Sequence, residues 1–166
     1  MDFILRPWRI DDVHSITKYA NNKKIADNLR NAYPFPYTLE DALTFISGFL
    51  AEDESYICRA IEVNGEAAGS IGVFQKEDVY EKSAEMGYWL AEPYWGRGIM
   101  TRAIRQMAAL AFETMDIVRI FAEPYAYNKG SRRALEKAGF ALEGVLKKSV
   151  CKNGKIFDSC IYALVR

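Results

Sequence analysis

Helical spacing of apolar side chains dominates the first fifty residues. One predicted helix begins near Asp11, which could cap it. A short helical piece is expected at 21–29, and a further helix follows Thr38, which forms a loose capping box with Asp41. The expected inward positions are Val13, Ile16 and Tyr19 in the first helix, and Leu39, Leu43, Ile46 and Leu50 in the last.

Strand-like runs replace this pattern from residue 56 onward. Asn64-Gly65 and Asn153-Gly154 each predict a tight type I′ hairpin turn between two such runs. The run 83–91 is apolar on both faces from Met86 onward, which is typical of a central strand covered on both sides. The expected strands are 3–6, 56–63, 67–74, 83–91, 117–123, 141–151 and 155–165, with helices at 99–114 and 129–138. This order predicts one mixed α/β domain over residues 1–166.

Composition narrows the function classes. The 22 Lys and Arg balance the 22 Asp and Glu, so a broad surface for nucleic acid or acidic membrane is not expected. No stretch reaches the roughly 20 apolar residues of a membrane helix. The single His14 and three scattered cysteines have no zinc spacing, so no metal site is expected. The cysteines favour a cytoplasmic location and are expected to be small core residues: Cys58, Cys151 and Cys160.

The segment between the buried strand and the helix at 99–114 carries the most specific pattern. Gly96 and Gly98, one residue apart, allow a tight turn that exposes backbone N–H groups. The helix that follows adds unpaired N–H groups and the positive end of its dipole, which together suit a phosphate. A plain strand-to-helix turn is the alternative. The P-loop pattern is absent, and the dinucleotide pattern fails because Thr101 stands where it needs glycine.

The same segment, Pro93-Tyr94-Trp95-Gly96-Arg97-Gly98, resembles the acetyl-CoA loop of the GCN5-related N-acetyltransferases, the GNAT superfamily. Pro93 stands where the general pattern has Gln or Arg. This form is similar to the subgroup related to ribosomal-protein N-terminal acetylases. Three further segments resemble that subgroup: Glu85-Met86-Gly87-Tyr88-Trp89-Leu90, Asn128-Lys129-Gly130-Ser131 through Ala138-Gly139-Phe140, and Leu142-Glu143-Gly144-Val145-Leu146.

The resemblance implies a fold and a coenzyme. It implies a mixed, mostly antiparallel sheet of about seven strands with about four flanking helices. Strands 4 and 5 should splay apart near a bulge at 90–92, where one backbone N–H would stabilise the oxyanion. Acetyl-CoA is the implied co-substrate, without a metal, and Arg97, then Arg102, would meet its 3′-phosphate. The implied coenzyme-binding residues are Leu90, Ala91, Trp95, Gly96, Arg97, Gly98, Ile99, Met100, Thr101 and Asn128.

Two side chains are the candidate catalytic residues. Glu85, a carboxylate on an apolar strand, is either a solvated rim residue or the base that deprotonates an incoming amine. The resemblance implies that Ser131 lies near the thioester sulfur and assists departure of the thiolate, and Leu135 stands where many other GNAT enzymes have a tyrosine for that task. Tyr125 or Tyr127 is the reserve for this role.

The acceptor is less defined than the reaction. The resemblance implies that Tyr33, Phe35 and Tyr37 line an acceptor pocket and that the acceptor is a protein N-terminal α-amine. A small amine such as a polyamine, amino sugar or antibiotic is the alternative, and the acidic run Glu52-Asp53-Glu54 would suit a polyamine. A non-catalytic acyl-CoA sensor is a rival from another class. No nucleic-acid or membrane partner is expected, and a homodimer is possible in such a family.

Overall fold

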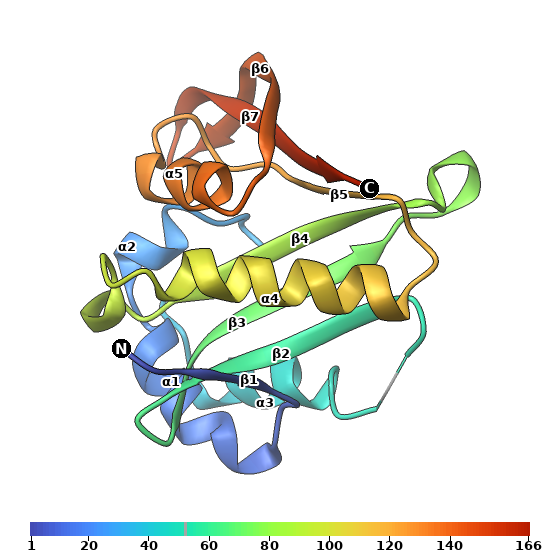
Figure 1. Cartoon of the computed structure of the whole chain (residues 1–166). Helices are drawn as coiled ribbons and strands as arrows, with labels where there is room; N and C mark the ends of the chain where they lie inside the picture. The colour runs from blue at the N-terminus through green and yellow to red at the C-terminus, as the bar shows by residue number, and fades with distance from the viewer. Residues whose placement is uncertain (52) are drawn as a thin grey trace.

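Seven strands form a single mixed sheet in the order β1-β2-β3-β4-β5-β7-β6 (Figure 1). The computed structural model describes residues 1–51 and 53–166. All neighbouring strands are antiparallel except β4 and β5, which run parallel. The predicted sheet is therefore confirmed. The strands are β1 Ile4–Arg6, β2 Tyr56–Val63, β3 Glu66–Gln75, β4 Ser83–Leu90, β5 Arg119–Ala122, β6 Ala141–Lys152 and β7 Lys155–Val165.

In the part of the chain that the structure describes, five α-helices flank the sheet, one more than the resemblance implies. The additional helix is a single turn that begins after Asn22, whose side chain accepts the N–H of Lys24. Short 3-10 turns lie at Ile10–Asp12, Asp78–Tyr80 and Glu92–Tyr94. The α-helices are α1 Val13–Ala20, α2 Lys23–Ala26, α3 Leu39–Ser47, α4 Ile99–Thr114 and α5 Lys129–Lys137.

The helices form two layers on opposite faces of the sheet. In Figure 1, α4 crosses in front of β2, β3 and β4, while α1 and α3 lie behind these strands. Each layer encloses its own apolar core. Ile104 and Met107 of α4 belong to one core, and Ile16 of α1, Ile46 of α3 and Trp89 of β4 belong to the other. Alternate residues of β4 therefore face different helical layers.

Both predicted hairpin turns are present. Asn64 and Gly65 have φ values of 52° and 82°, and Asn153 and Gly154 have values of 53° and 74°. A type I′ turn requires a positive φ at both central residues, which Asn and Gly adopt most readily. These local signals fix the registers of the β2–β3 and β6–β7 pairs.

Several sequence-based details are wrong. Leu39, Leu43 and Leu50 are exposed, because the capping box starts α3 such that Ala42 faces the core together with Ile46, the one predicted inward residue that is buried. Asp11 is exposed and does not cap α1, whose N-cap position is Asp12.

Two of the three cysteines are buried as predicted, and the third is exposed. Cys58 and Cys160 are buried, but Cys151 is exposed on β6, an edge strand that no further strand covers within the described residues. The prediction of a core position is therefore wrong for Cys151.

A buried ion-pair network ties β1 to the start of α1. The Arg6 guanidinium donates to both carboxylate oxygens of Asp12, each at 2.8 Å, and also pairs with Glu62 of β2. Asp12 in turn accepts the backbone N–H of Arg9 at 2.8 Å. Burial disfavours the ionised carboxylate, but the hydrogen bonds from Arg6 and Arg9 outweigh it and hold the pKa of Asp12 below its ordinary value.

Candidate active site

The sheet opens along a seam between β4 and β5. These strands pair only at Ser83, Ala84 and Glu85, opposite Arg119, Ile120 and Phe121. Beyond Glu85 the end of β4 has a neighbour on its β3 side alone. The predicted splay is confirmed.

The bulge predicted at 90–92 is not found. The register of β4 against β3 runs without a shift from Ala84 to Leu90, and the Ala91 N–H continues it by donating to the carbonyl of Ala68 at 2.8 Å. The splay therefore arises because β5 ends at Ala122 and its pairing with β4 stops, while β4 itself stays regular.

Peptide groups of β4 face this seam. Because Ala91 bonds directly to its partner on β3, and hydrogen-bonded pairs alternate along an antiparallel ladder, the main-chain groups of Tyr88 and Leu90 point away from β3. The Leu90 carbonyl accepts the indole N–H of Trp95 at 2.7 Å. The N–H groups of Tyr88 and Leu90 and the Tyr88 carbonyl have no strand partner within the described residues and form an edge that an extended ligand could pair with.

The glycine loop leads from this edge into α4. Gly96 and Gly98 have φ values of 72° and 73°, in the left-handed region that glycine tolerates best. A Cβ at either position would meet no atom within 4 Å, because both face the open cleft. Gly98 is the N-cap of the 16-residue α4, so the N–H groups of Ile99, Met100 and Thr101 have no intrahelical acceptor. This is a site for an anionic phosphate group.

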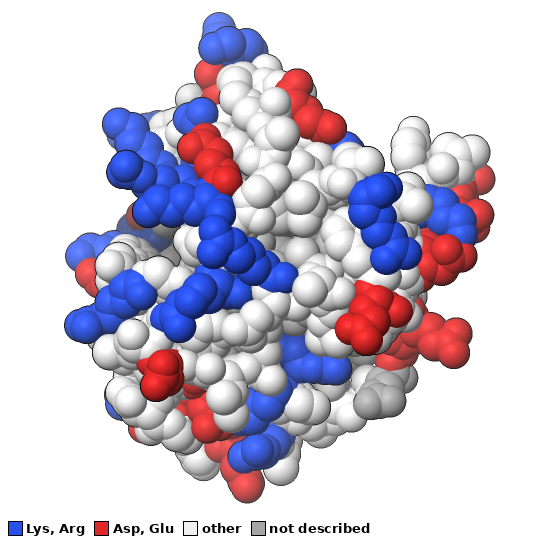
Figure 2. Space-filling view, in the orientation of Figure 1, with Lys and Arg blue, Asp and Glu red and all other residues white. Residues whose placement is uncertain are grey.

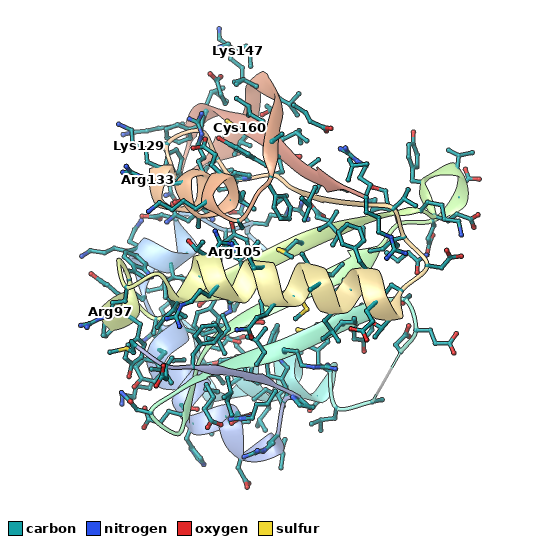
Figure 3. All side chains as sticks on the ribbon, in the orientation of Figure 1. Arg97, Arg105, Lys129, Arg133, Lys147 and Cys160 are labelled. Atoms are coloured by element: carbon teal, nitrogen blue, oxygen red, sulfur yellow. The ribbon has the colours of Figure 1, made fainter. Side chains whose placement is uncertain are left out.

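Basic side chains surround the loop. Figure 2 shows Lys and Arg gathered in a band on the side of the molecule where α4 begins and α5 lies. Figure 3 places Arg97 on the loop and Lys129 and Arg133 on α5 along this side, and all three line the cleft. Arg102 turns away from the cleft, since it donates to the Met1 carbonyl and lies 5.0 Å from the centre of the Phe3 ring. Arg97 thus remains the stronger candidate for a phosphate contact.

One cavity of about 980 Å³ joins these features. It runs from the glycine loop and the start of α5, through the seam, to the aromatic side chains beneath α3. Its size is at the upper end of the usual range for ligand pockets. The predicted coenzyme residues that line it are Leu90, Trp95, Gly96, Arg97, Gly98, Ile99, Met100, Thr101 and Asn128. Ala91 does not line the cavity, because it is fully buried and its N–H is bonded to β3.

Ser131 lies on the α5 side of the cavity. Its hydroxyl is 2.6 Å from the hydroxyl of Tyr88, and its N–H donates to the Asn128 side chain at 3.3 Å, which caps α5. Burial raises the pKa of Tyr88 well above its usual value, although the hydrogen bond with Ser131 opposes this. Tyr88 therefore stays protonated and is able to donate at neutral pH.

Glu85 lines the cavity on the other face of β4. Its carboxylate accepts a hydrogen bond from Arg30 at 2.7 Å, and its side chain is 21% exposed. Because side chains alternate along a strand, Glu85 and Tyr88 lie on opposite faces. The seam is therefore flanked by a carboxylate on one face and a hydroxyl pair on the other.

Of the three residues predicted to line an acceptor pocket, one lines the cavity and two do not. Tyr33 lines the cavity, 6.1 Å from Trp89 between ring centres, and donates its hydroxyl to the Ala20 carbonyl at 2.7 Å. Phe35 is exposed and Tyr37 is buried against Tyr33, and neither lines the cavity. Burial raises the pKa of Tyr37 to about 12.

Two site residues were missed by sequence reasoning. Tyr88 was identified only as part of a strand motif, and Arg30 was not singled out. Each acquires its role from a partner distant in sequence, Ser131 for Tyr88 and Glu85 for Arg30. The sequence signal for Tyr88 was its position three residues after the candidate base on the same strand, which places the two side chains on opposite faces of the sheet.

Neither a metal centre nor a membrane span is found in the described chain. Residues 1–51 and 53–166 contain no group of three or more His, Cys, Asp or Glu side chains arranged to hold a metal ion. None of the helices described is both long and apolar enough to cross a bilayer.

Comparison with known families decides the class of this site. The family model described as "Acetyltransferase (GNAT) domain" matches residues 2–141. The chain belongs to the GNAT acetyltransferase family. The Bacillus subtilis (strain 168) relative "Probable N-acetyltransferase YjcK" is 34% identical over 133 residues, which are 78% of this chain and 74% of that relative.

Solved GNAT structures show the same architecture. The microcin C7 self-immunity acetyltransferase MccE, solved with acetyl-CoA and AMP, has a TM-score of 0.85 and 27% identity, covering 99% of this chain and 93% of that chain. RimJ of Mycobacterium smegmatis, solved with a CoA-disulfide, has a TM-score of 0.86 and 25% identity, covering 98% of this chain and 81% of that chain. The predicted GNAT fold and acetyltransferase class are confirmed.

Relatives with named acceptors differ among themselves. The ribosomal-protein-serine acetyltransferase of Escherichia coli (strain K12) is 31% identical over 97 residues, 57% of this chain and 54% of that enzyme. The spermidine N(1)-acetyltransferase of the same organism is 24% identical over 161 residues, 95% of this chain and 84% of that enzyme. Similarity alone therefore does not choose between a protein and a polyamine acceptor.

Proposed function

We propose that this GNAT enzyme transfers the acetyl group of acetyl-CoA to the α-amine at the N-terminus of a polypeptide. The observation that carries the proposal is the seam between β4 and β5. There, free peptide groups of β4 lie between Glu85 on one face and the Ser131–Tyr88 pair on the other. A homodimer and a cytoplasmic location, both expected from the sequence, remain predictions.

The proposed step is direct attack. The protonated amine loses one proton to Glu85, directly or through water, Glu85 passes that proton to solvent, and the free amine nitrogen adds to the thioester carbonyl carbon. The C–N bond forms, the C–S bond breaks, the nitrogen releases its second proton to water, and the sulfur leaves with a proton from the Ser131 hydroxyl. Ser131 regains a proton from Tyr88, which solvent then replenishes. The N–H of Leu90 faces the seam and would donate to the carbonyl oxygen as negative charge develops.

The coenzyme would be held mainly by main-chain groups. The N–H groups from Gly96 to Thr101 suit its pyrophosphate, and Arg97, with Lys129 and Arg133, supplies positive charge for its remaining phosphate. Binding through amides and guanidinium groups needs no metal. Activity is therefore expected to be unchanged by EDTA.

The charges around the acceptor end of the cavity support an α-amine over a polyamine. A polyamine carries several positive charges and requires several carboxylates, whereas the described residues lining the cavity include only Glu85 and Glu123 as acids. Of the acidic run 52–54, Glu52 lies outside the described residues, and Asp53 and Glu54 do not line the cavity.

A panel of acceptors tests the proposal. Release of free coenzyme A would be measured with peptides bearing a free N-terminus, the same peptides already N-acetylated, spermidine and an aminoglycoside. Turnover is expected with the free peptides alone. Turnover with spermidine but with no peptide would show that the enzyme acetylates small amines. Binding of acetyl-CoA without turnover of any acceptor would favour a non-catalytic acyl-CoA sensor.

Replacing Glu85 tests its role as the base. Glu85→Gln is expected to lower kcat about 100-fold at neutral pH and much less at high pH, where free amine is abundant. Glu143→Gln is the matched control, because Glu143 also pairs with an arginine, Arg119, at 2.7 Å but does not line the cavity. Unchanged turnover of Glu85→Gln at neutral pH would show that the base lies elsewhere or is only water.

A further inference from the structure

A trough crosses the sheet on the face that carries Glu85. The cross-strand row Cys58, Gly72 and Gly87 runs over β2, β3 and β4 and consists of small residues. Large side chains flank it, with Phe74 on the Glu85 side and Trp89 on the other. The row spans two inter-strand spacings, about 10 Å, and its β4 end lies at the seam.

Aromatic side chains cover this trough. Phe45 of α3 and Phe49, which follows α3, lie 5.0 Å apart between ring centres, and both line the cavity. Tyr33 approaches from the loop between α2 and α3 and lies 6.1 Å from Trp89. The cover is therefore aromatic, Phe74 and Trp89 are the large apolar side chains of the walls, and the cavity over the trough is continuous with the seam.

The open part of the trough lies over Gly87. A Cβ at Gly87 would meet no atom within 4 Å, although Gly87 lies on the floor of the cavity. Over Gly72 the space is narrower, since a Cβ there would come within 2.7 Å of the Phe74 ring, although Gly72 and Cys58 also line the cavity. Phe74 thus narrows the trough one strand away from the seam.

Resting on the proposed function, we infer that this trough receives the side chain of the first residue of the acceptor and selects an apolar one. An α-amine beside Glu85 would place its own side chain over Gly87, between Glu85 and Trp89. An ionised side chain in this position would lose its hydration without gaining a partner, because the nearby charges, Glu85 and Arg30, already pair with each other. The preferred acceptors are peptides that begin with Leu, Met or Phe.

The first experiment varies only the first residue of one acceptor peptide. The kcat/KM of acetylation is expected to be at least about tenfold higher for Leu, Met or Phe than for Ser or Asp, in keeping with the usual discrimination of apolar pockets. Equal values, or a preference for Ser or Asp, would overturn the inference while leaving N-terminal acetylation in place. If no peptide is acetylated, the proposed function itself fails.

Filling the trough provides the second experiment. Gly87→Val is expected to lower kcat/KM about tenfold or more for the Leu-initiated peptide and much less for the Gly-initiated peptide. Gly144→Val is the matched control, because Gly144 is also a strand glycine whose Cβ would meet nothing within 4 Å, but it lies on β6 outside the cavity. An equal loss for both peptides would contradict the assignment of Gly87 to a side-chain pocket.

Opening the trough should have the opposite effect. Phe74→Ala removes the ring that lies over Gly72 and would lengthen the free space across β3. Relative kcat/KM is then expected to shift from Leu toward Trp as the first residue. Thermal stabilisation by acetyl-CoA would verify that each variant is folded, and an unchanged Trp-to-Leu ratio in a folded Phe74→Ala protein would count against the inference.

Discussion

At the scale of single residues, the Tyr88–Ser131 hydrogen bond is the contact with the most direct chemical meaning. A lone serine hydroxyl on a helix surface that has given up its proton has no neighbouring group to replace that proton. Here the Ser131 hydroxyl lies 2.6 Å from a tyrosine hydroxyl that burial keeps protonated. The pair can pass a proton to a leaving sulfur without waiting for a solvent molecule to enter the seam.

This arrangement makes Tyr88 a positioning residue with a testable signature. Tyr88→Phe is expected to lower kcat about tenfold, to leave the KM for acetyl-CoA nearly unchanged, and to cause no further loss when added to Ser131→Ala. Steady-state kinetics of the two single variants and the double variant measure this coupling. Tyr19→Phe is the control, because Tyr19 also donates its hydroxyl, to Glu66, but does not line the main cavity. Additive losses would show that Tyr88 acts independently of Ser131.

At the scale of elements, the glycine loop and α4 form one unit. The helix begins at Ile99, as predicted, because Gly98 reverses the chain in a left-handed conformation that few other residues adopt. The loop is held to β4 by the Trp95 indole on the Leu90 carbonyl. The anion site and the seam therefore keep a fixed spacing.

A side chain in this loop should abolish coenzyme binding. At 100 times its dissociation constant, acetyl-CoA should stabilise the native protein by about 2.7 kcal/mol. Gly98→Val is expected to remove this thermal shift, because the side chain would project into the phosphate site and φ is 73°. Gly65→Val is the control, since its φ of 82° imposes similar strain in a hairpin outside the cavity. A full thermal shift in Gly98→Val would exclude the loop as the phosphate site.

Local signals explain which elements the sequence predicted well. The two Asn-Gly turns, the bounds of α4 and the capping box of α3 depend on residues within a few positions of one another. The buried face of α3 did not follow from local pattern, because Leu39 and Leu43 satisfy the same helical spacing as Ala42 and Ile46. Packing against the sheet decides which of these two sets of residues is buried. The ion pair between Arg30 and Glu85 likewise depends on tertiary structure, since the two residues are distant in sequence.

At the scale of the whole molecule, the network of Arg6, Asp12 and Glu62 links stability to pH. In the folded protein the pKa of the Asp12 carboxylate lies below the ordinary value of 3.8. In acid the unfolded chain therefore takes up a proton before the native chain does. The resulting stabilisation is fully present above the unfolded pKa and is lost as pH falls through the lower folded pKa.

Asp12→Asn should lower the stability of the protein at neutral pH and lower it less in acid. At pH 7 it is expected to cost about 3 kcal/mol, because it leaves a buried guanidinium with one partner fewer. As pH falls below about 4, the difference from the parent should shrink, since Asp12 is then protonated in the unfolded parent chain before it is protonated in the native one. Urea unfolding at pH 7 and pH 3 measures this. Asp116→Asn, at a side chain that is 85% exposed, should change little, and a pH-independent difference for Asp12→Asn would contradict the account.

The seam has one more consequence, for motion. Within the described residues only three residue pairs join β4 to β5, so the sheet consists of two half-sheets, β1–β4 and β5–β7–β6, that share a short paired segment. A coenzyme lying along Tyr88 and Leu90 would act as a replacement strand that couples the halves. In hydrogen–deuterium exchange, the N–H groups of Tyr88 and Leu90 should exchange quickly in the free protein and slowly with coenzyme A, while Trp89, already bonded to β3, changes little. Substrate binding would then complete the sheet and strengthen the connection between its two halves.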